Sequence, residues 1–203
     1  MRIAVLALQG AFIEHEKMLS KLGVDSFEIR QRKDIQSSFD GLIIPGGEST
    51  VQGKLLAELG ITEPLRNLIN AGTPVLATCA GLILLAREIG TGGERHLGTL
   101  PVRVLRNIYG RQLGSFVSEG RVGKLENFRE VFIRAPGITE ILDPETEVLA
   151  VTGDRITGVR FRNQFGFAFH PELTDNFGLH LMFLRSAGLF PESETAPNVR
   201  QAA

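Results

Sequence analysis

The chain has 203 residues, with 22 Lys and Arg, 23 Asp and Glu, and a formal net charge of −1. Because basic and acidic residues are nearly equal in number, the net charge gives no indication that the protein binds nucleic acid or an anionic membrane surface. No apolar run reaches the roughly 18 residues of a membrane helix, and the N-terminal apolar run is too short for a signal peptide. A single cysteine excludes an internal disulfide and favours a reducing, cytoplasmic location. We therefore expect neither nucleic acid nor membrane as a partner.

Strands and helices alternate along the first half of the chain. Continuous apolar runs predict buried strands at residues 2–8, 26–30, 41–44 and 74–78. Helices are predicted at residues 12–22, 51–59 and 64–71, and another starts after Cys79 and ends near Gly90. Such alternation predicts an α/β fold, with a mostly parallel sheet and helices on both faces.

From Leu97 onward the pattern changes to short β-like runs. They lie at residues 100–106, 112–117, 131–134, 148–152, 156–161 and 165–169. The last two runs predict an antiparallel hairpin, so the second half adds antiparallel strands to the sheet or lays a small ribbon beside it. Residues 174–188 predict a final helix. We assign residues 1–190 to a single domain and 191–203 to a flexible tail.

The only cysteine, Cys79, lies at the tight turn between an apolar strand and an apolar helix. A nucleophile on such a turn projects above the sheet, and the next backbone N–H, that of Ala80, faces the atom it attacks. The helix N-terminus favours the thiolate. A lone cysteine in an apolar run is more often a small buried hydrophobe, so Cys79 alone does not indicate catalysis.

The segment His170-Pro171-Glu172 follows a Phe-rich strand far along the chain. In an extended chain residues i and i+2 share a face, and Pro171 is expected to keep the segment extended. A carboxylate beside an imidazole fixes its tautomer and stabilises the imidazolium. Cys79, His170 and Glu172 would supply a nucleophile, a base and an orienting acid. By itself, the pair also fits a strand-end histidine and a helix-capping glutamate.

The loop that contains Gly46 and Gly47 follows the carboxyl end of a buried strand, where ligands bind in open α/β sheets. Glycine lets the backbone approach a ligand, and the Gly47 N–H could join that of Ala80 in an oxyanion hole. A plain turn followed by a Ser49 or Thr50 helix cap is the alternative. The loop lacks the spacings of nucleotide-binding motifs.

The other histidines do not suggest a metal site. His15 and His180 fall in predicted helices and His96 in a Gly-rich loop, and we expect each to be structural or solvated. No set of His, Cys and acidic residues has metal-ligand spacing. We therefore expect no metal and no cofactor.

Three motifs together resemble the class I, triad-type glutamine amidotransferases. They are PGGEST at residues 45–50, TCAGL at 78–82 and FHPEL at 169–173. Further segments resemble the glutaminase subunits of pyridoxal 5′-phosphate synthase, namely LQGA at 8–11, RNIYGRQ at 106–112, SF at 115–116 and VFIRAP at 131–136. The resemblance runs from the first strand to about residue 184. Ala77, Ile108 and Gly114 depart from the pattern of these relatives.

The resemblance implies a flavodoxin-like fold and hydrolysis of L-glutamine to glutamate and ammonia, with Cys79 as nucleophile and His170 and Glu172 as its relay. It also implies a set of residues that hold glutamine: Gly46, Gly47, Glu48, Arg106, Ile133 and Arg134. An arginine can bind the α-carboxylate with two parallel hydrogen bonds.

The resemblance further implies a partner, a synthase subunit with a (β/α)8 barrel. This subunit would combine the ammonia with a pentose phosphate and a triose phosphate to make pyridoxal 5′-phosphate. Such glutaminases are nearly silent alone, and we expect the Gly46–Gly47 peptide to turn on docking so that its N–H faces the oxyanion.

Two alternatives stay open at this point. The chain could serve another synthase, such as imidazole glycerol phosphate synthase, although the segments at 106–112 and 132–136 argue against it. It could also be an inactive scaffold on the same fold, although the intact set of Cys79, His170 and Glu172 argues against that.

Overall fold

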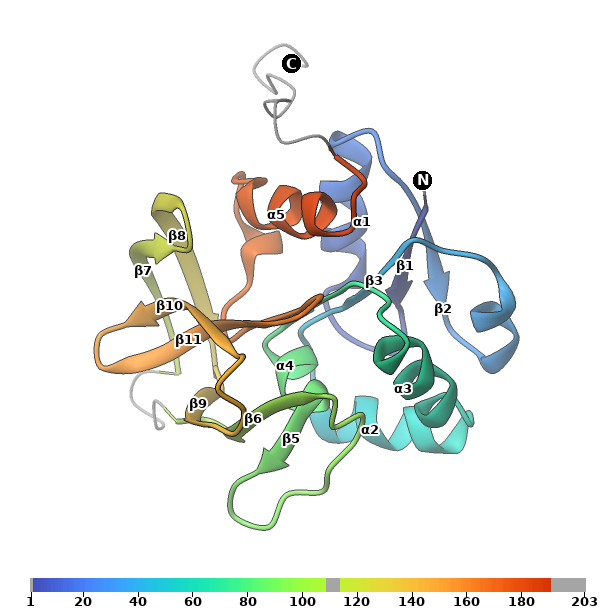
Figure 1. The fold of residues 1–203 in the computed structure, drawn as a ribbon, viewed down its shortest axis with the longest axis horizontal. Coiled ribbons are helices and arrows are strands. Elements are labelled where there is room, and N and C mark those ends of the chain that lie inside the picture. The colour runs from blue at the N-terminus through green and yellow to red at the C-terminus, as the bar shows by residue number, and fades with distance from the viewer. Residues whose placement is uncertain (1, 109–113, 191–203) are drawn as a thin grey trace.

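The computed structural model describes residues 2–108 and 114–190. Five strands run parallel in the order β2-β1-β3-β4-β12 (Figure 1). Their bounds are β1 (Arg2–Leu6), β2 (Asp25–Ile29), β3 (Gly41–Ile44), β4 (Val75–Thr78) and β12 (Gln164–Phe167). The inner strands β3, β4 and β12 are buried along their whole length, as strands covered on both faces must be. The predicted flavodoxin-like α/β fold is confirmed.

Helices cover both faces of these strands. Figure 1 shows α1 and α5 on one side of the sheet and α2, α3 and α4 on the other. Their bounds are α1 (Phe12–Lys21), α2 (Ser49–Glu58), α3 (Thr62–Asn70), α4 (Ala80–Leu85) and α5 (Gly178–Ser186), with short 3₁₀ helices η1 (Arg32–Gln36) and η2 (Pro171–Leu173). In the described residues, no helix is both long enough and apolar enough to cross a bilayer.

The second half of the chain extends the same sheet with antiparallel strands. Beyond β12 the order continues β11-β10-β7-β8. The bounds are β7 (Ser115–Val122), β8 (Leu125–Ile133), β10 (Glu147–Thr152) and β11 (Arg155–Phe161). The predicted hairpin is confirmed, because β11 pairs antiparallel with β12 and Phe161 is opposite Gln164. Since β12 also pairs parallel with β4, it joins the two halves.

A branch of three strands leaves this path at β11. Its members are β5 (Ala86–Ile89), β6 (Leu100–Leu105) and β9 (Gly137–Ile141). The predicted helix from residue 80 to Gly90 is therefore wrong in its second half. The backbone of Ala86 turns to ψ 135°, and residues 86–89 pair with β6. This segment contains no helix breaker, so only the long-range pairing makes it a strand.

Other elements also differ from the prediction. The strand β8 begins at Leu125 rather than at residue 131, and no strand was predicted where β9 lies. Helix starts differ as well. The last helix begins at Gly178 rather than at residue 174, because the Asn176 side chain accepts the Gly178 N–H at 2.8 Å in a turn before the helix. The cap of α2 is Glu48, whereas Ser49 and Thr50 are already helical. Glutamate is not a preferred N-cap residue, which is why the sequence pattern favoured the hydroxyl side chains.

A cluster of phenylalanines fixes the segment that ends at His170. The Phe169 ring lies 5.3 Å from that of Phe167 and 5.6 Å from that of Phe132, between ring centroids. All three side chains are buried. The His170 N–H donates to the Val131 carbonyl at 2.8 Å, which ties the segment to β8. Aromatic packing and this hydrogen bond therefore place His170 at the carboxyl end of the parallel strands.

Candidate active site

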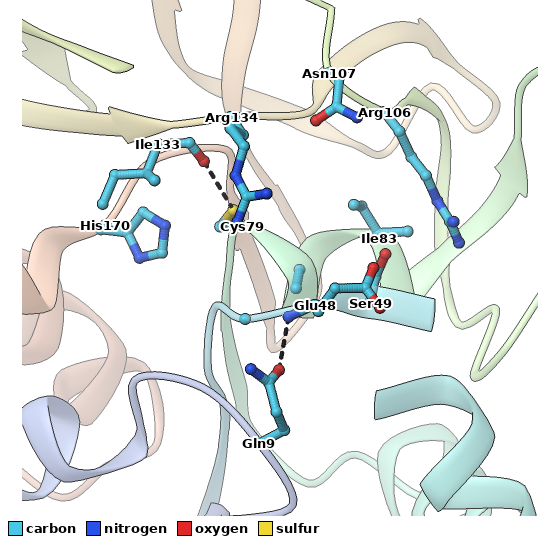
Figure 2. A pocket seen from close by; sticks show the side chains of 12 residues that line it. Gln9, Glu48, Ser49, Cys79, Ile83, Arg106, Asn107, Ile133, Arg134 and His170 are labelled. Atoms are coloured by element: carbon cyan, nitrogen blue, oxygen red, sulfur yellow. Dashed lines mark hydrogen bonds between the residues drawn. The ribbon is translucent and has the colours of Figure 1, made fainter. Parts of the chain in front are cut away.

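The carboxyl ends of β1, β3, β4 and β12 meet at one edge of the sheet, beside a cavity of about 270 Å³ (Figure 2). The residues that line the cavity are Gln9, Gly47, Glu48, Ser49, Cys79, Ala80, Ile83, Arg106, Asn107, Ile133, Arg134 and His170. All the predicted site residues except Gly46 and Glu172 are among them. No catalytic or glutamine-binding role was predicted for Gln9, Ser49, Ile83 or Asn107.

Cys79 occupies a strained turn between β4 and α4. Its backbone has φ 48° and ψ −102°, a conformation that residues other than glycine rarely adopt. The Cys79 N–H donates to the Phe167 carbonyl at 2.8 Å, which fixes the turn against β12. A Cβ at Gly81 would lie 2.1 Å from the Ile44 carbonyl oxygen, so the turn brings α4 directly onto β3. The strain holds the sulfur at the cavity wall.

His170 lies beside the sulfur and in contact with Glu172. Its Nδ1 is 2.7 Å from Glu172 Oε1, and the Glu172 side chain is buried. The expected extended conformation is wrong, because residues Pro171–Leu173 form the 3₁₀ helix η2 with His170 at its N-cap position. Proline suits the first position of such a turn, and the turn folds Glu172 back under the imidazole.

The buried pair carries opposite charges. Burial by itself would lower the pKa of His170, but its contacts with Cys79 and Glu172 raise that pKa to about 10. Burial would raise the pKa of Glu172, yet His15 and the hydrogen bond to His170 lower it. His170 is thus an imidazolium at neutral pH, beside the sulfur of Cys79. An imidazolium at this place favours a thiolate nucleophile.

Two hydrogen bonds fix the loop at Gly46, and the first of them involves the Gly46–Gly47 peptide. Its carbonyl accepts the Ala11 N–H at 3.0 Å, and the preceding Gly46 N–H donates to Thr78 Oγ1, also at 3.0 Å. Since the carbonyl and N–H of a trans peptide point in opposite directions, the Gly47 N–H faces away from Ala11. Rotation of this peptide would break the hydrogen bond to Ala11. The expected turning on docking stays a prediction.

Close contacts explain two glycines at this loop. A Cβ at Gly46 would lie 2.3 Å from His170 Cε1, so only glycine lets the loop pass over the imidazole. A Cβ at Gly10, where φ is +105°, would lie 1.9 Å from the Gly46 carbonyl oxygen. The loop after β1 and the loop after β3 therefore fit together only because both carry glycine.

Both the carboxylate and the backbone N–H of Glu48 form hydrogen bonds. Its carboxylate accepts the N–H groups of Thr50 at 3.2 Å and Val51 at 2.8 Å, and its own N–H donates to Gln9 Oε1 at 2.7 Å. Burial would raise the pKa of Glu48, but these backbone N–H groups lower it. Gln9 thereby supports the loop. The LQGA segment marked it as part of a family motif, but only the fold shows what its amide contacts.

Arginines line the other side of the cavity. Arg106 donates from Nη1 to Thr50 Oγ1 at 2.9 Å, and its buried Nε has no hydrogen-bond partner among the described residues. Arg134 and Asn107 have positive φ values of 45° and 51°, so strained backbone surrounds the cavity here as well. The Ile133 carbonyl oxygen lies 3.9 Å from Cys79 Sγ, as the dashed line in Figure 2 shows.

The structure shows the contacts of two of the three residues that depart from the family pattern. Ile108 packs on Gly137, where a Cβ would lie 2.7 Å from the Ile108 side chain. The Gly114 carbonyl accepts the Arg134 N–H next to the cavity. The rest of the predicted 106–112 motif, from residue 109 on, lies outside the described residues. In the described part of the chain, no three His, Cys, Asp or Glu side chains gather as a metal site would require.

Comparison with known proteins agrees with this geometry. Residues 5–188 match the model of the SNO glutamine amidotransferase family. A relative from Desulfitobacterium hafniense (strain DSM 10664 / DCB-2), named pyridoxal 5′-phosphate synthase subunit PdxT, is 57% identical over 186 residues, which cover 92% of this chain and 93% of the relative. A relative of the same name from Methanocorpusculum labreanum is 52% identical over 184 residues, covering 91% and 96%.

Solved structures show the same fold. A crystal structure described as a glutamine amidotransferase superposes with a TM-score of 0.86 at 44% identity, covering 92% of this chain and 98% of its own.

Proposed function

Because the chain belongs to the SNO glutamine amidotransferase family, we propose that it hydrolyses L-glutamine to L-glutamate and ammonia through a thioester on Cys79. The observation that carries this proposal is the contact of a buried, charged His170–Glu172 pair with the only cysteine, at the wall of a cavity. A cysteine nucleophile with a histidine base and an orienting acid is the arrangement that acyl transfer requires.

The reaction would begin with attack of the Cys79 sulfur on the side-chain amide carbon of glutamine. The N–H groups of Ala80 and Gly47 would stabilise the oxyanion. His170 would give its proton to the leaving ammonia, and would then take a proton from the water that hydrolyses the thioester. Glu172 would keep the imidazole oriented and stabilise its positive charge throughout.

Glutamine would lie in the cavity with its amide beside Cys79. Arg106 and Arg134 are the two arginines that line the cavity, and the Nε of Arg106, which has no hydrogen-bond partner among the described residues, would donate to the α-carboxylate. The Ile133 carbonyl is an acceptor at the same wall, and Gly46, Gly47 and Glu48 form the loop that closes the opposite side.

The ammonia would pass to a synthase subunit that makes pyridoxal 5′-phosphate. The relatives named synthase subunits support this partner, since they match the chain along almost its full length. In this proposal the partner is a (β/α)8 barrel that joins the ammonia to a pentose phosphate and a triose phosphate.

Glutamate release from L-glutamine tests the proposal. It would be measured with the chain alone and after addition of the pyridoxal 5′-phosphate synthase subunit of a relative. We expect little release alone and clear stimulation on mixing, with a Cys79→Ala variant as the blank. No release in the mixture, although a binding assay shows that the two proteins associate, would contradict the proposed activity.

A further inference from the structure

A second group of buried polar side chains lies behind Glu172, away from the cavity. His15 of α1, Thr78 of β4 and His180 of α5 are each 0% exposed. His15 Nε2 lies 3.4 Å from Glu172 Oε2 and 3.2 Å from Thr78 Oγ1, and His15 Nδ1 lies 3.0 Å from His180 Nε2. Elements from both ends of the chain therefore converge on the acid that orients His170.

The surroundings select one tautomer of His15. Burial lowers the pKa of His15, although Glu172 opposes this, and burial also lowers the pKa of His180 to about 3. Each imidazole is thus neutral at physiological pH and carries one proton. Glu172 Oε2 lies 3.4 Å from His15 Nε2, can only accept, and has no hydrogen-bond partner among the described residues. A proton on His15 Nε2 therefore faces this oxygen and Thr78 Oγ1 together, and Nδ1 then accepts from Nε2–H of His180.

Thr78 connects the same histidine to the loop after β3. Its Oγ1 accepts the Gly46 N–H at 3.0 Å and lies within hydrogen-bond distance of His15 Nε2. One imidazole therefore contacts both the orienting acid and, through one hydroxyl, the peptide segment proposed to supply an oxyanion donor. A histidine needed only to fill the core would be replaced at lower cost by an apolar side chain, because burial of unneeded polar groups is unfavourable.

We propose that His15 is a positioning residue, whose Nε2–H holds Glu172 and Thr78 in the geometry that the Cys79 reaction needs, with His180 fixing its tautomer. This role rests on the proposed glutaminase function. It differs from the sequence-based expectation, in which His15 and His180 were structural or solvated side chains.

A matched pair of variants separates this role from simple core packing. The terminal amide of His15→Gln can place an N–H where the Nε2–H lies, whereas the shorter amide of His15→Asn reaches only the Nδ1 position. In the complex with the synthase subunit, we expect His15→Asn to lower kcat roughly 10- to 100-fold with little change in KM, as loss of an outer hydrogen-bonded partner does elsewhere. We expect His15→Gln to retain most of kcat.

The melting temperature of both variants is the control for folding. Equal kcat in the two variants, whether both normal or both lowered, would overturn the proposal. If neither variant folds, Thr78→Ser and Thr78→Val give the same comparison at the hydroxyl. We then expect the serine variant to retain kcat and the valine variant to lose it, and equal kcat in these two would overturn the proposal.

The tautomer itself can be read without any activity. The ¹⁵N chemical shifts of His15 in the unmodified chain should show a protonated Nε2 and an unprotonated Nδ1. The opposite tautomer would overturn the inference. An unmodified complex with no glutaminase activity but with the expected tautomer would contradict the proposed function, while the hydrogen bonds inferred for His15 would stand.

Discussion

Two buried charges behind the sulfur decide how Cys79 can react. The imidazolium of His170 and the carboxylate of Glu172 are 2.7 Å apart, between Nδ1 and Oε1, in a part of the protein from which water is largely excluded. Electrostatic interactions are stronger in such surroundings than in water. Small changes at these residues should therefore have large effects on turnover.

Replacement of Cys79 by alanine should abolish glutamate formation. The thioester cannot form without the sulfur, whereas the side chain is only 6% exposed and contributes little surface to a partner. Glutamate release and binding to the synthase subunit, by calorimetry, are the two measurements. Turnover that persists in Cys79→Ala would show that another group is the nucleophile.

Replacement of Glu172 by glutamine should shift the pH dependence of turnover. The carboxylate helps to raise the pKa of His170 to about 10, so without it the imidazolium loses its proton at lower pH. The alkaline limb of kcat/KM should therefore move toward neutral pH, with a smaller loss of activity than in His170→Asn, which removes the base. An unchanged alkaline limb would mean that the carboxylate does not control the charge of His170.

At the scale of elements, the site depends on how closely α4 and the loops approach the strands. The turn after β4 and the loop after β3 each rely on a glycine with no room for a side chain, at Gly81 and Gly46. Short distances of this kind place backbone N–H groups where a reacting atom can reach them. They also make the site sensitive to a single added methyl group.

Replacement of Gly81 by alanine should test this close approach. Its Cβ would lie 2.1 Å from the Ile44 carbonyl oxygen, so α4 would have to move away from β3. We expect a loss of about 1–3 kcal/mol in the free energy of unfolding, as is usual for overpacking, together with a strong loss of kcat. Urea unfolding and glutamate release are the measurements.

Gly23→Ala is the control for the Gly81 variant. At Gly23 a Cβ meets nothing within 4 Å, although φ is +72°. This variant should therefore lose some stability through backbone strain but keep its kcat. If Gly81→Ala kept full stability and activity, the close approach of α4 to β3 would not be essential.

Glu130 of β8 gives a prediction about stability alone. Its side chain is buried and accepts from Thr152 Oγ1 at 2.6 Å, and burial raises its pKa above the ordinary value of 4.5. An acid with a raised pKa in the folded state loses its stabilising contribution as pH rises through that pKa. Glu130→Gln, which stays neutral, should therefore melt at a higher temperature near neutral pH, and this gain should shrink as pH falls toward 4.5. A variant that melts lower at neutral pH would contradict the assignment.

At the scale of the whole molecule, β12 connects the two halves of the chain. It pairs with β4 on one side and with β11 on the other, and it leads directly to His170. Cys79 follows β4 in the first half of the chain, whereas His170 and Glu172 follow β12 in the second half, so the pairing of β12 with β4 brings the proposed triad together. The assignment of residues 1–190 to a single domain and of 191–203 to a flexible tail stays a prediction.

A single domain should unfold in one cooperative step. Far-ultraviolet circular dichroism reports the secondary structure, and near-ultraviolet circular dichroism of the buried phenylalanines reports the tertiary packing. We expect the two urea transitions to coincide, because β4 and β11 are both paired with β12. Loss of the near-ultraviolet signal while the far-ultraviolet signal is still native would contradict a single cooperative unit.

The sequence by itself determined the α/β class, the first four parallel strands, the hairpin of β11 and β12, and the candidate residues Cys79, His170 and Glu172, whereas the parallel pairing of β12 with β4 came from the structure. These features are carried by local signals: buried strands are continuous apolar runs, and the motifs have fixed spacings. The tertiary structure alone decided that residues 86–89 form a strand, that Glu48 caps α2, and that His15 lies behind Glu172. Each of these depends on contacts between segments far apart in the chain, which local periodicity and spacing do not encode.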